Sequence, residues 1–202
     1  MARPREFDES AALDSAIECF WRHGYSATSV RDLAAGMGIG CTSLYNAFGN
    51  KRSVFALALE RYLDRSMRQR FRRFEATRPP KQAIRGFIEE IIRRSLADSR
   101  RRGCFLVNSA MEVAPHDRGL RSVIAARLGE LEAFFRRCVI AAQRNGSVPA
   151  ERNPVELARL LLGVVLGIRV LARTNPDSAL LHGLARPALA LLERSPRTGG
   201  NR

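Results

Sequence analysis

The sequence predicts an all-α protein with a small N-terminal domain and a larger C-terminal helical domain. Apolar residues recur at helical spacing through most of the 202 residues. No segment shows the alternation of apolar and polar residues that is typical of half-buried strands. The clearest interruption is the Pro pair within residues 77–80, where we expect the domains to meet. The predicted divisions are residues 1–50, a connecting helix over 51–78, and residues 79–202.

The N-terminal domain is expected to contain three helices. The first covers residues 10–23, with an inner face of Leu13, Ala16, Ile17 and Phe20. The second begins after Thr28 or Ser29, either of which can cap it, and ends at Gly38, where the backbone can turn left-handed. Its apolar residues recur at i, i+3, i+4 and i+7, namely Val30, Leu33, Ala34 and Met37.

A third short helix is predicted over residues 41–48. Its apolar residues Leu44, Ala47 and Phe48 face inward, and this leaves a polar outer face of Thr42, Ser43, Tyr45 and Asn46. Two short helices joined by a glycine-bearing turn are typical of the helix-turn-helix, whose second helix enters the DNA major groove. The segment therefore predicts a DNA-reading domain.

With its flanks, this segment resembles the TetR family of one-component transcriptional regulators. The resemblance rests on ALDSAIECFWRHGYSATSVRDLA, GMGIGCTSLYNAFGNK and SVFALALERY, and it extends over about residues 7–62. It implies that Tyr45 and Lys51 hold phosphates, that Thr28 caps the second helix near the DNA backbone, and that Thr42 and Ser43 reach bases. The predicted DNA-binding residues are Thr28, Thr42, Ser43, Tyr45, Asn46 and Lys51. Gly40 and Cys41 stand where the family often has Ser then Lys, so the usual cap of the third helix is missing.

The net charge of +14 does not by itself identify the DNA-binding segment. Residues 1–52 carry as many acidic as basic side chains, whereas residues 53–102 carry fourteen basic against six acidic ones. The connecting helix contains a basic run that consists of Arg65, Arg68, Arg70, Arg72 and Arg73. This run predicts a solvated surface or, alternatively, long-range attraction of DNA. The alternative class of protein is an arginine-rich, sequence-nonspecific nucleic-acid-binding or scaffolding protein.

Other classes find little support in the sequence. We expect no membrane span and no signal-peptide core, and hence a cytoplasmic protein. The four cysteines are far apart and lack C-x-x-C spacing, so neither a metal site nor a cofactor is expected. No grouping typical of catalysis is present, so an enzyme is not expected. Arg3 and Arg5 form a basic arm that either enters a minor groove or is a solvated tail.

The C-terminal domain is predicted to contain five helices, over residues 82–99, 104–114, 117–145, 154–173 and 178–192. The last two are apolar almost all round, which indicates burial against another subunit. TetR-like proteins dimerise through their last two long helices, so the resemblance implies a homodimer. The predicted interface residues are Gly163, Gly167, Leu184 and Leu191.

The resemblance also implies an effector pocket enclosed by the middle helices. The candidate lining residues are Phe87, Ile91, Cys104, Phe105, Met111, Phe134 and Leu162, together with Phe135; from sequence they are equally compatible with ordinary core. Cys104 follows three arginines and is expected to open a helix, an environment that favours a reactive thiolate. It is interpreted either as a sensor of oxidants or electrophiles or as a packed thiol. Together the features predict a dimeric repressor that a small-molecule effector releases from a palindromic operator.

Overall fold

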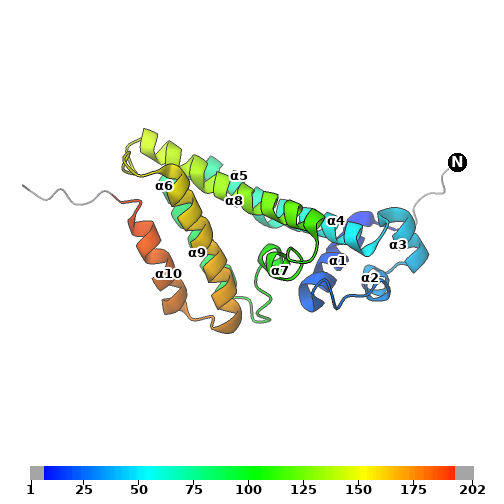
Figure 1. Cartoon of the computed structure of the whole chain (residues 1–202). Helices are drawn as coiled ribbons and strands as arrows, with labels where there is room; N and C mark the ends of the chain where they lie inside the picture. Colours follow the sequence, from blue (N-terminus) through cyan, green and yellow to red (C-terminus); the bar gives the residue numbers. More distant parts are fainter. Residues whose placement is uncertain (1–6, 194–202) are drawn as a thin grey trace, which may run out of the picture. The chain divides into compact units, whose positions relative to one another are not determined.

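The computed structural model describes residues 7–193, and every regular element in that range is a helix (Figure 1). In chain order these are α1 (Glu9–His23), α2 (Val30–Met37), α3 (Cys41–Phe48), α4 (Lys51–Leu63), the π-helical η1 (Asp64–Arg68), α5 (Gln69–Thr77), α6 (Pro80–Leu96), α7 (Phe105–Glu112), α8 (Arg118–Arg144), α9 (Pro154–Thr174) and α10 (Ser178–Ala190). The all-α prediction is confirmed. The predicted basic arm at Arg3 and Arg5 lies outside the described residues.

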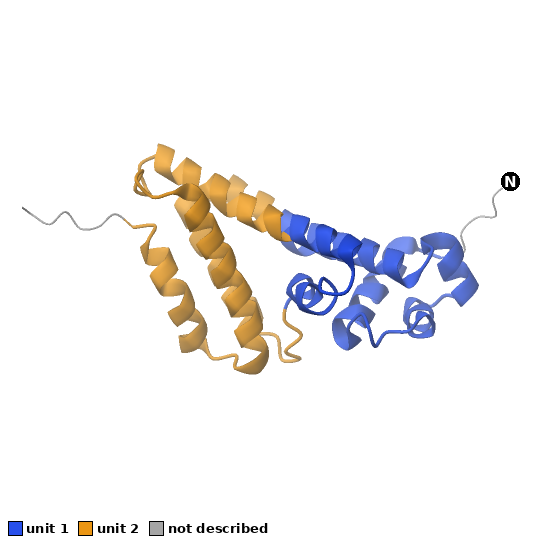
Figure 2. Ribbon diagram, viewed as in Figure 1, with its two compact units in different colours: residues 1–69, 104–127 blue, residues 70–103, 128–202 orange. Residues whose placement is uncertain are grey.

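The described chain divides into two compact units (Figure 2). The first unit combines residues 7–69 with 104–127, and the second combines residues 70–103 with 128–193. The first unit therefore contains α1 to η1 together with α7 and the start of α8. Residues from the N-terminal domain and from the middle of the chain thus share one core.

Polar residues immediately before the helices determine where several of them begin. The Asp8 carboxylate accepts a hydrogen bond from the Ser10 N–H over 2.8 Å at the start of α1. At α2, the Ser29 hydroxyl accepts from the Asp32 N–H over 3.1 Å, and the Asp32 carboxylate accepts from the Ser29 N–H over 2.8 Å. Such reciprocal caps satisfy backbone donors that no helical carbonyl can reach. The caps of α4, α9 and α10 are Asn50, Asn153 and Asp177.

Aromatic side chains form the centre of the first unit. The Phe55 ring of α4 stands edge-on to Phe20 of α1 and to Tyr25, with centroid separations of 5.1 and 4.9 Å. Phe105, the first residue of α7, lies 5.5 Å from Phe55. Such tilted and edge-to-face pairs add to the stabilisation from apolar burial. These contacts hold α7 in the same core as the N-terminal helices.

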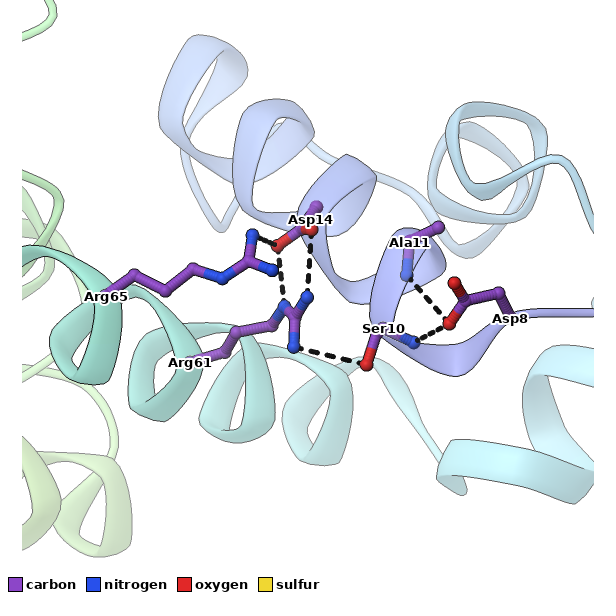
Figure 3. A network of polar contacts seen from close by, with 6 residues as sticks. All are labelled: Asp8, Ser10, Ala11, Asp14, Arg61 and Arg65. Carbon is purple, nitrogen blue, oxygen red and sulfur yellow. Dashed lines mark hydrogen bonds and ion pairs between the residues drawn. The ribbon is translucent and has the colours of Figure 1, made fainter.

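An ion-pair network joins α1 to α4 and η1 on the surface of the first unit (Figure 3). The Arg61 guanidinium donates to both carboxylate oxygens of Asp14, over 2.6 and 2.9 Å, and Arg65 donates to the same carboxylate over 2.5 Å. The hydrogen bond from Arg61 is the main reason that the pKa of Asp14 lies below its usual value. A bidentate arginine–carboxylate pair of this kind fixes orientation as well as distance.

Phenylalanine rings form the centre of the second unit. Phe71 of α5 stacks on Phe134 of α8 at 4.5 Å, and Phe87 of α6 lies 5.1 Å from the same Phe134 ring. Phe74 and Phe135 extend this cluster around Phe87. The five rings thus connect α5, α6 and α8.

The basic run of the connecting helix is only in part the solvated surface that the sequence predicts, because Arg65, Arg72 and Arg73 are exposed but Arg70 is not. Arg70 is buried, with its guanidinium 5.8 Å from the centre of the Phe87 ring. Arg73 donates to the buried carboxylate of Glu90, and Arg94 donates to the same carboxylate over 2.9 Å. Arg68 pairs with Glu60 and Asp64. The solvated-surface prediction is therefore wrong for Arg70, and the other pairs show that much of this charge is balanced within the fold.

Candidate nucleic-acid interface

The turn between α2 and α3 has the geometry that the sequence predicts. Gly38 adopts a left-handed conformation with φ of 69°, and the N–H groups of Gly38 and Ile39 donate back to the carbonyls of Ala35 and Ala34 over 3.2 and 3.0 Å. Leu33 of α2 and Leu44 of α3 are completely buried, so both helices are anchored from one side. A helix-turn-helix is thus present at the predicted residues.

The opposite side of α3 carries the polar outer face that the sequence predicts, including Thr42 and Ser43, which are predicted to reach bases. Thr42, Ser43, Tyr45 and Asn46 are all exposed, and 52% of the Tyr45 surface is accessible to solvent. Hydroxyl and amide groups can both donate to and accept from base edges. These four side chains therefore form a polar surface on α3, and none of them is buried in the core.

The start of α3 exposes backbone donors as well. Its N-cap is Gly40, which makes no side-chain capping hydrogen bond, as the sequence predicts. The first backbone hydrogen bond of α3 runs from the Leu44 N–H to the Gly40 carbonyl, over 3.0 Å. The N–H groups of residues 41 to 43 come earlier in the chain and therefore have no carbonyl acceptor within the helix. The partial positive charge of a helix N-terminus favours phosphate at such a position.

Thr28 lies in the loop that joins α1 to α2, and Lys51 contacts that loop. The Thr28 side chain is 1% exposed and its hydroxyl donates to the Gly24 carbonyl over 2.6 Å. The cap of α2 is Ser29, so the capping role that the resemblance implies for Thr28 is wrong. The Lys51 ammonium donates to the Ser26 carbonyl over 3.4 Å and lies 4.5 Å from the centre of the Tyr25 ring. The DNA contacts of both residues stay a prediction.

Two carboxylates, which the sequence did not reveal as functional, bind the α1–α2 loop and the start of α4. They belong to Glu112, the last residue of α7, and to Asp117. The Glu112 carboxylate accepts from the N–H groups of Tyr25 and Ser26 over 3.1 and 2.8 Å. Asp117 forms a bidentate pair with Arg52 in the first turn of α4, with distances of 2.6 and 3.0 Å. The hydrogen bond from Arg52 is the main reason that the pKa of Asp117 lies well below its usual range. Both partners are more than sixty residues away in the chain, so no local pattern reveals them.

The predicted pocket residues are divided between the two units. Phe87, Ile91, Phe134 and Leu162 belong to the second unit, where Phe87 and Phe134 are part of the phenylalanine cluster, as is Phe135. Cys104, Phe105 and Met111 belong to the first unit, where Phe105 is in the aromatic core. Met111 is 63% exposed, so its side chain lines no interior space of the described unit. The effector pocket stays a prediction.

Cys104 is the N-cap of α7, not its first residue as the sequence predicts. Its sulfur is half-buried and lies 3.8 Å from the Tyr62 hydroxyl. The environments of two other cysteines differ sharply from that of exposed Cys41. Burial raises the pKa of the Cys138 thiol to about 12 and also raises the pKa of Cys19.

These environments predict the order of thiol alkylation in the folded chain. Cys138 is expected to react with iodoacetamide at pH 8 at least about a hundredfold more slowly than Cys41, because so little of it is thiolate. Peptide mass spectrometry over time would measure both rates, and the same labelling in guanidinium chloride is the control in which they should converge. The sensor interpretation of Cys104 requires Cys104 to label faster than Cys138; equal rates would make it a packing residue.

The predicted dimer residues lie on α9 and α10. Gly163 is exposed, with open space where a Cβ would stand, whereas a Cβ on Gly167 would lie 3.0 Å from the Leu184 side chain. Leu184 and Leu191 are half-buried. Leu160, Val170 and Leu180 are large apolar residues exposed on the same two helices. An apolar surface of this kind is typical of an interface, and its role in dimerisation stays a prediction.

Neither a metal centre nor a membrane span is found in the described part of the chain. Within residues 7–193, no three His, Cys, Asp or Glu side chains are placed so that they could hold a metal ion together. No helix of that range is both long enough and apolar enough to cross a bilayer.

Family models match both parts of the chain. The model of the tetR family of bacterial regulatory proteins matches residues 12–58, and that of a tetracyclin repressor-like C-terminal domain matches residues 80–187. The uncharacterized HTH-type transcriptional regulator YezE of Bacillus subtilis (strain 168) is 32% identical over 194 residues, 96% of this chain and 100% of the relative. The HTH-type transcriptional repressor ComR of Escherichia coli (strain K12) is 28% identical, over 94% of this chain and 90% of its own.

A solved structure is similar over nearly the full length. It is a cysteine mutant of the TetR family transcriptional regulator CifR, complexed with 26 bp double-strand operator DNA. It is 30% identical and superposes with a TM-score of 0.83 over 93% of this chain and 98% of its own. The chain therefore belongs to the TetR family, and it is a DNA-binding transcriptional regulator rather than an enzyme.

Proposed function

We propose that this regulator is a homodimeric repressor that binds a palindromic operator through α3 and is released from it by a small-molecule effector. The observation that carries the proposal is the exposed polar face of α3 on a helix whose other face is buried. Support comes from the similarity to a regulator whose structure contains operator DNA and to a transcriptional repressor.

Within this proposal, the residues around α3 have two different tasks. Thr42 and Ser43 in the first turn of α3 read base edges, with Asn46 one turn later on the same exposed side. Tyr45 and Lys51 hold phosphates, helped by the free N–H groups at the start of α3. Thr28 acts indirectly, since its hydroxyl holds the Gly24 carbonyl at the end of α1. Phosphate contacts set affinity, whereas base contacts set sequence preference.

This division predicts two classes of variant. Tyr45→Ala and Lys51→Ala are expected to weaken binding about tenfold on operator and scrambled duplexes alike, because a phosphate contact carries no sequence information. Thr42→Ala and Ser43→Ala are expected to lower the ratio between operator and scrambled affinity. Fluorescence anisotropy titrations of both duplexes at one fixed salt concentration would measure the four effects, with an operator selected from a random duplex library.

A suitable control is Arg93→Ala, which removes an exposed positive charge from α6 in the second unit. It should leave both affinities unchanged. If the wild type binds operator and scrambled duplexes equally, the proposal is wrong, and the protein is instead a sequence-nonspecific nucleic-acid-binding protein that binds through its positive charge. If all four α3 and α4 variants bind as wild type does, another surface contacts the DNA.

The dimer is proposed to form through the exposed apolar stripe of α9 and α10. On α9 the stripe follows one face through Leu160, Gly163 and Val170. On α10 it includes Leu180 and Gly183. Two copies related by a two-fold axis would present two α3 helices to successive major grooves about 34 Å apart. A palindromic operator follows from that symmetry.

Release is proposed to pass through α7. The helix contributes Phe105 to the aromatic core, and its last residue, Glu112, holds the α1–α2 loop. Asp117, five residues later, holds the first turn of α4 through Arg52. An effector that favours a shifted position of α7 would therefore displace the loop beside Lys51 and the start of α4 together.

A further inference from the structure

The second unit contains a groove between α6 and α10, with a volume of about 400 Å³. Its floor consists of Ile88 and Ile92 of α6 and of Ala185 and Leu189 of α10. The floor is entirely aliphatic. A volume of this size falls within the range of about 300–1,000 Å³ that small-molecule sites occupy.

Charged side chains of both signs surround this floor, namely Arg85 and Arg186, Glu89 and Glu193, together with His182. The Glu193 carboxylate is shared by two cations, Arg85 and Lys81, the latter at 2.8 Å. Glu89 pairs with His182 over 3.2 Å. Arg186 also lines the groove, and within residues 7–193 it has no acidic partner. Its guanidinium is therefore available to an anion at the edge of an apolar surface.

The floor of the groove differs from the surfaces that the proposed function uses. On α6, Phe87 belongs to the phenylalanine cluster, whereas Ile88 and Ile92 face the groove. On α10, the floor residues Ala185 and Leu189 lie on nearly the opposite side of the helix from Leu180 and Gly183 of the proposed dimer stripe, at about 100° per residue. Arg186 and Ala190 follow Gly183 by three and seven positions and therefore lie between the floor and the stripe. A ligand on the floor would thus occupy neither α3 nor the stripe, although the groove borders the stripe at Gly183.

We propose that this groove binds a small amphipathic carboxylate, with its alkyl chain on the aliphatic floor and its carboxylate on Arg186. Binding of the alkyl chain is favoured because it removes apolar surface from water. Binding of the carboxylate is favoured by a planar, charge-assisted hydrogen-bonded pair with the Arg186 guanidinium. The site does not depend on operator binding, so it can exist even if the proposed function is wrong.

Isothermal titration of the full-length protein with sodium octanoate would test the proposal. We expect saturable binding with one site per chain. Hexanoate should bind about tenfold more weakly, because two fewer methylene groups leave water. Neutral 1-octanol has the same alkyl chain and should also bind about tenfold more weakly, because it lacks the charge. Anisotropy with operator DNA in the same buffer would report the proposed function separately.

Three variants locate the site. Arg186→Gln should weaken octanoate about tenfold and leave 1-octanol unchanged, whereas Arg93→Gln, on an exposed face of α6 outside the groove, should change neither. Ala190→Trp should abolish binding, because the indole would fill the groove from its edge. Circular dichroism would establish that each variant is folded. Octanoate that binds without saturation, or binds Arg186→Gln and wild type equally, would overturn the proposal.

Discussion

Replacing Gly163 by leucine is expected to leave the chain folded but monomeric and to weaken operator binding at least about a hundredfold. The glycine is exposed on α9 and has open space around its missing side chain, so the leucine meets nothing within its own chain. In the proposed dimer it would hold the partner helix away. A monomer engages one half-site at a time and loses the gain from linked binding. Sedimentation velocity and operator titration would measure the two losses.

Gly129→Leu is the matched control for this variant. Gly129 is also an exposed helical glycine with open space around it, but it belongs to α8 and not to the apolar stripe of α9 and α10. Leucine has the higher helix propensity by nearly 1 kcal/mol, so neither substitution should destabilise the isolated chain. Gly183→Leu on α10 should behave as Gly163→Leu does. If both stripe variants remain dimers with wild-type affinity, the interface lies elsewhere.

Gly167 is a less informative position, although the sequence groups it with Gly163. A side chain there would press on Leu184 of α10 in the same chain, 3.0 Å from the new Cβ. Gly167→Leu should therefore disturb the packing of α9 against α10 whether or not a dimer forms. A loss of dimer in that variant would not separate an interface effect from damage within the chain.

Replacing Glu112 by alanine is expected to lower the free energy of unfolding by about 2 kcal/mol and operator affinity by up to about thirtyfold. The carboxylate is the acceptor for two backbone N–H groups of the α1–α2 loop. Without it those donors lose their partner, and the loop that carries the Ser26 carbonyl beside Lys51 is no longer held. Urea denaturation and operator titration would measure the two effects.

Met111→Ala provides the control, because the preceding side chain is exposed and should contribute little to either measurement. Glu112→Gln should give a free energy of unfolding and an operator affinity between those of wild type and Glu112→Ala, because its amide oxygen can accept only one of the two hydrogen bonds, and more weakly. Asp117→Asn tests the second contact while keeping an oxygen for the Leu120 N–H that it caps over 2.8 Å. If the alanine variant matches wild type in both stability and affinity, the loop does not depend on Glu112.

The amino-acid sequence by itself determined the helical class and the boundaries of most helices. The periodicity of Leu33, Ala34 and Met37, the cap at Ser29 and the left-handed Gly38 act within a few residues of one another. The outer face of α3 follows from the same local geometry, since burial of Leu44 and Phe48 leaves Thr42 and Tyr45 outside. Local interactions of this kind are readable from a single sequence.

Only the tertiary structure decided which polar and charged groups meet. Glu112 reaches the N–H of Ser26 across 86 positions of the chain, and Arg52 reaches Asp117 across 65. Arg70 of α5 is buried, with its guanidinium 5.8 Å from the centre of the Phe87 ring of α6. Helical periodicity specifies which face of a helix is apolar but not which distant element covers it. The partners of these groups, and the groove beside Arg186, therefore depend on packing between helices that are far apart in the chain.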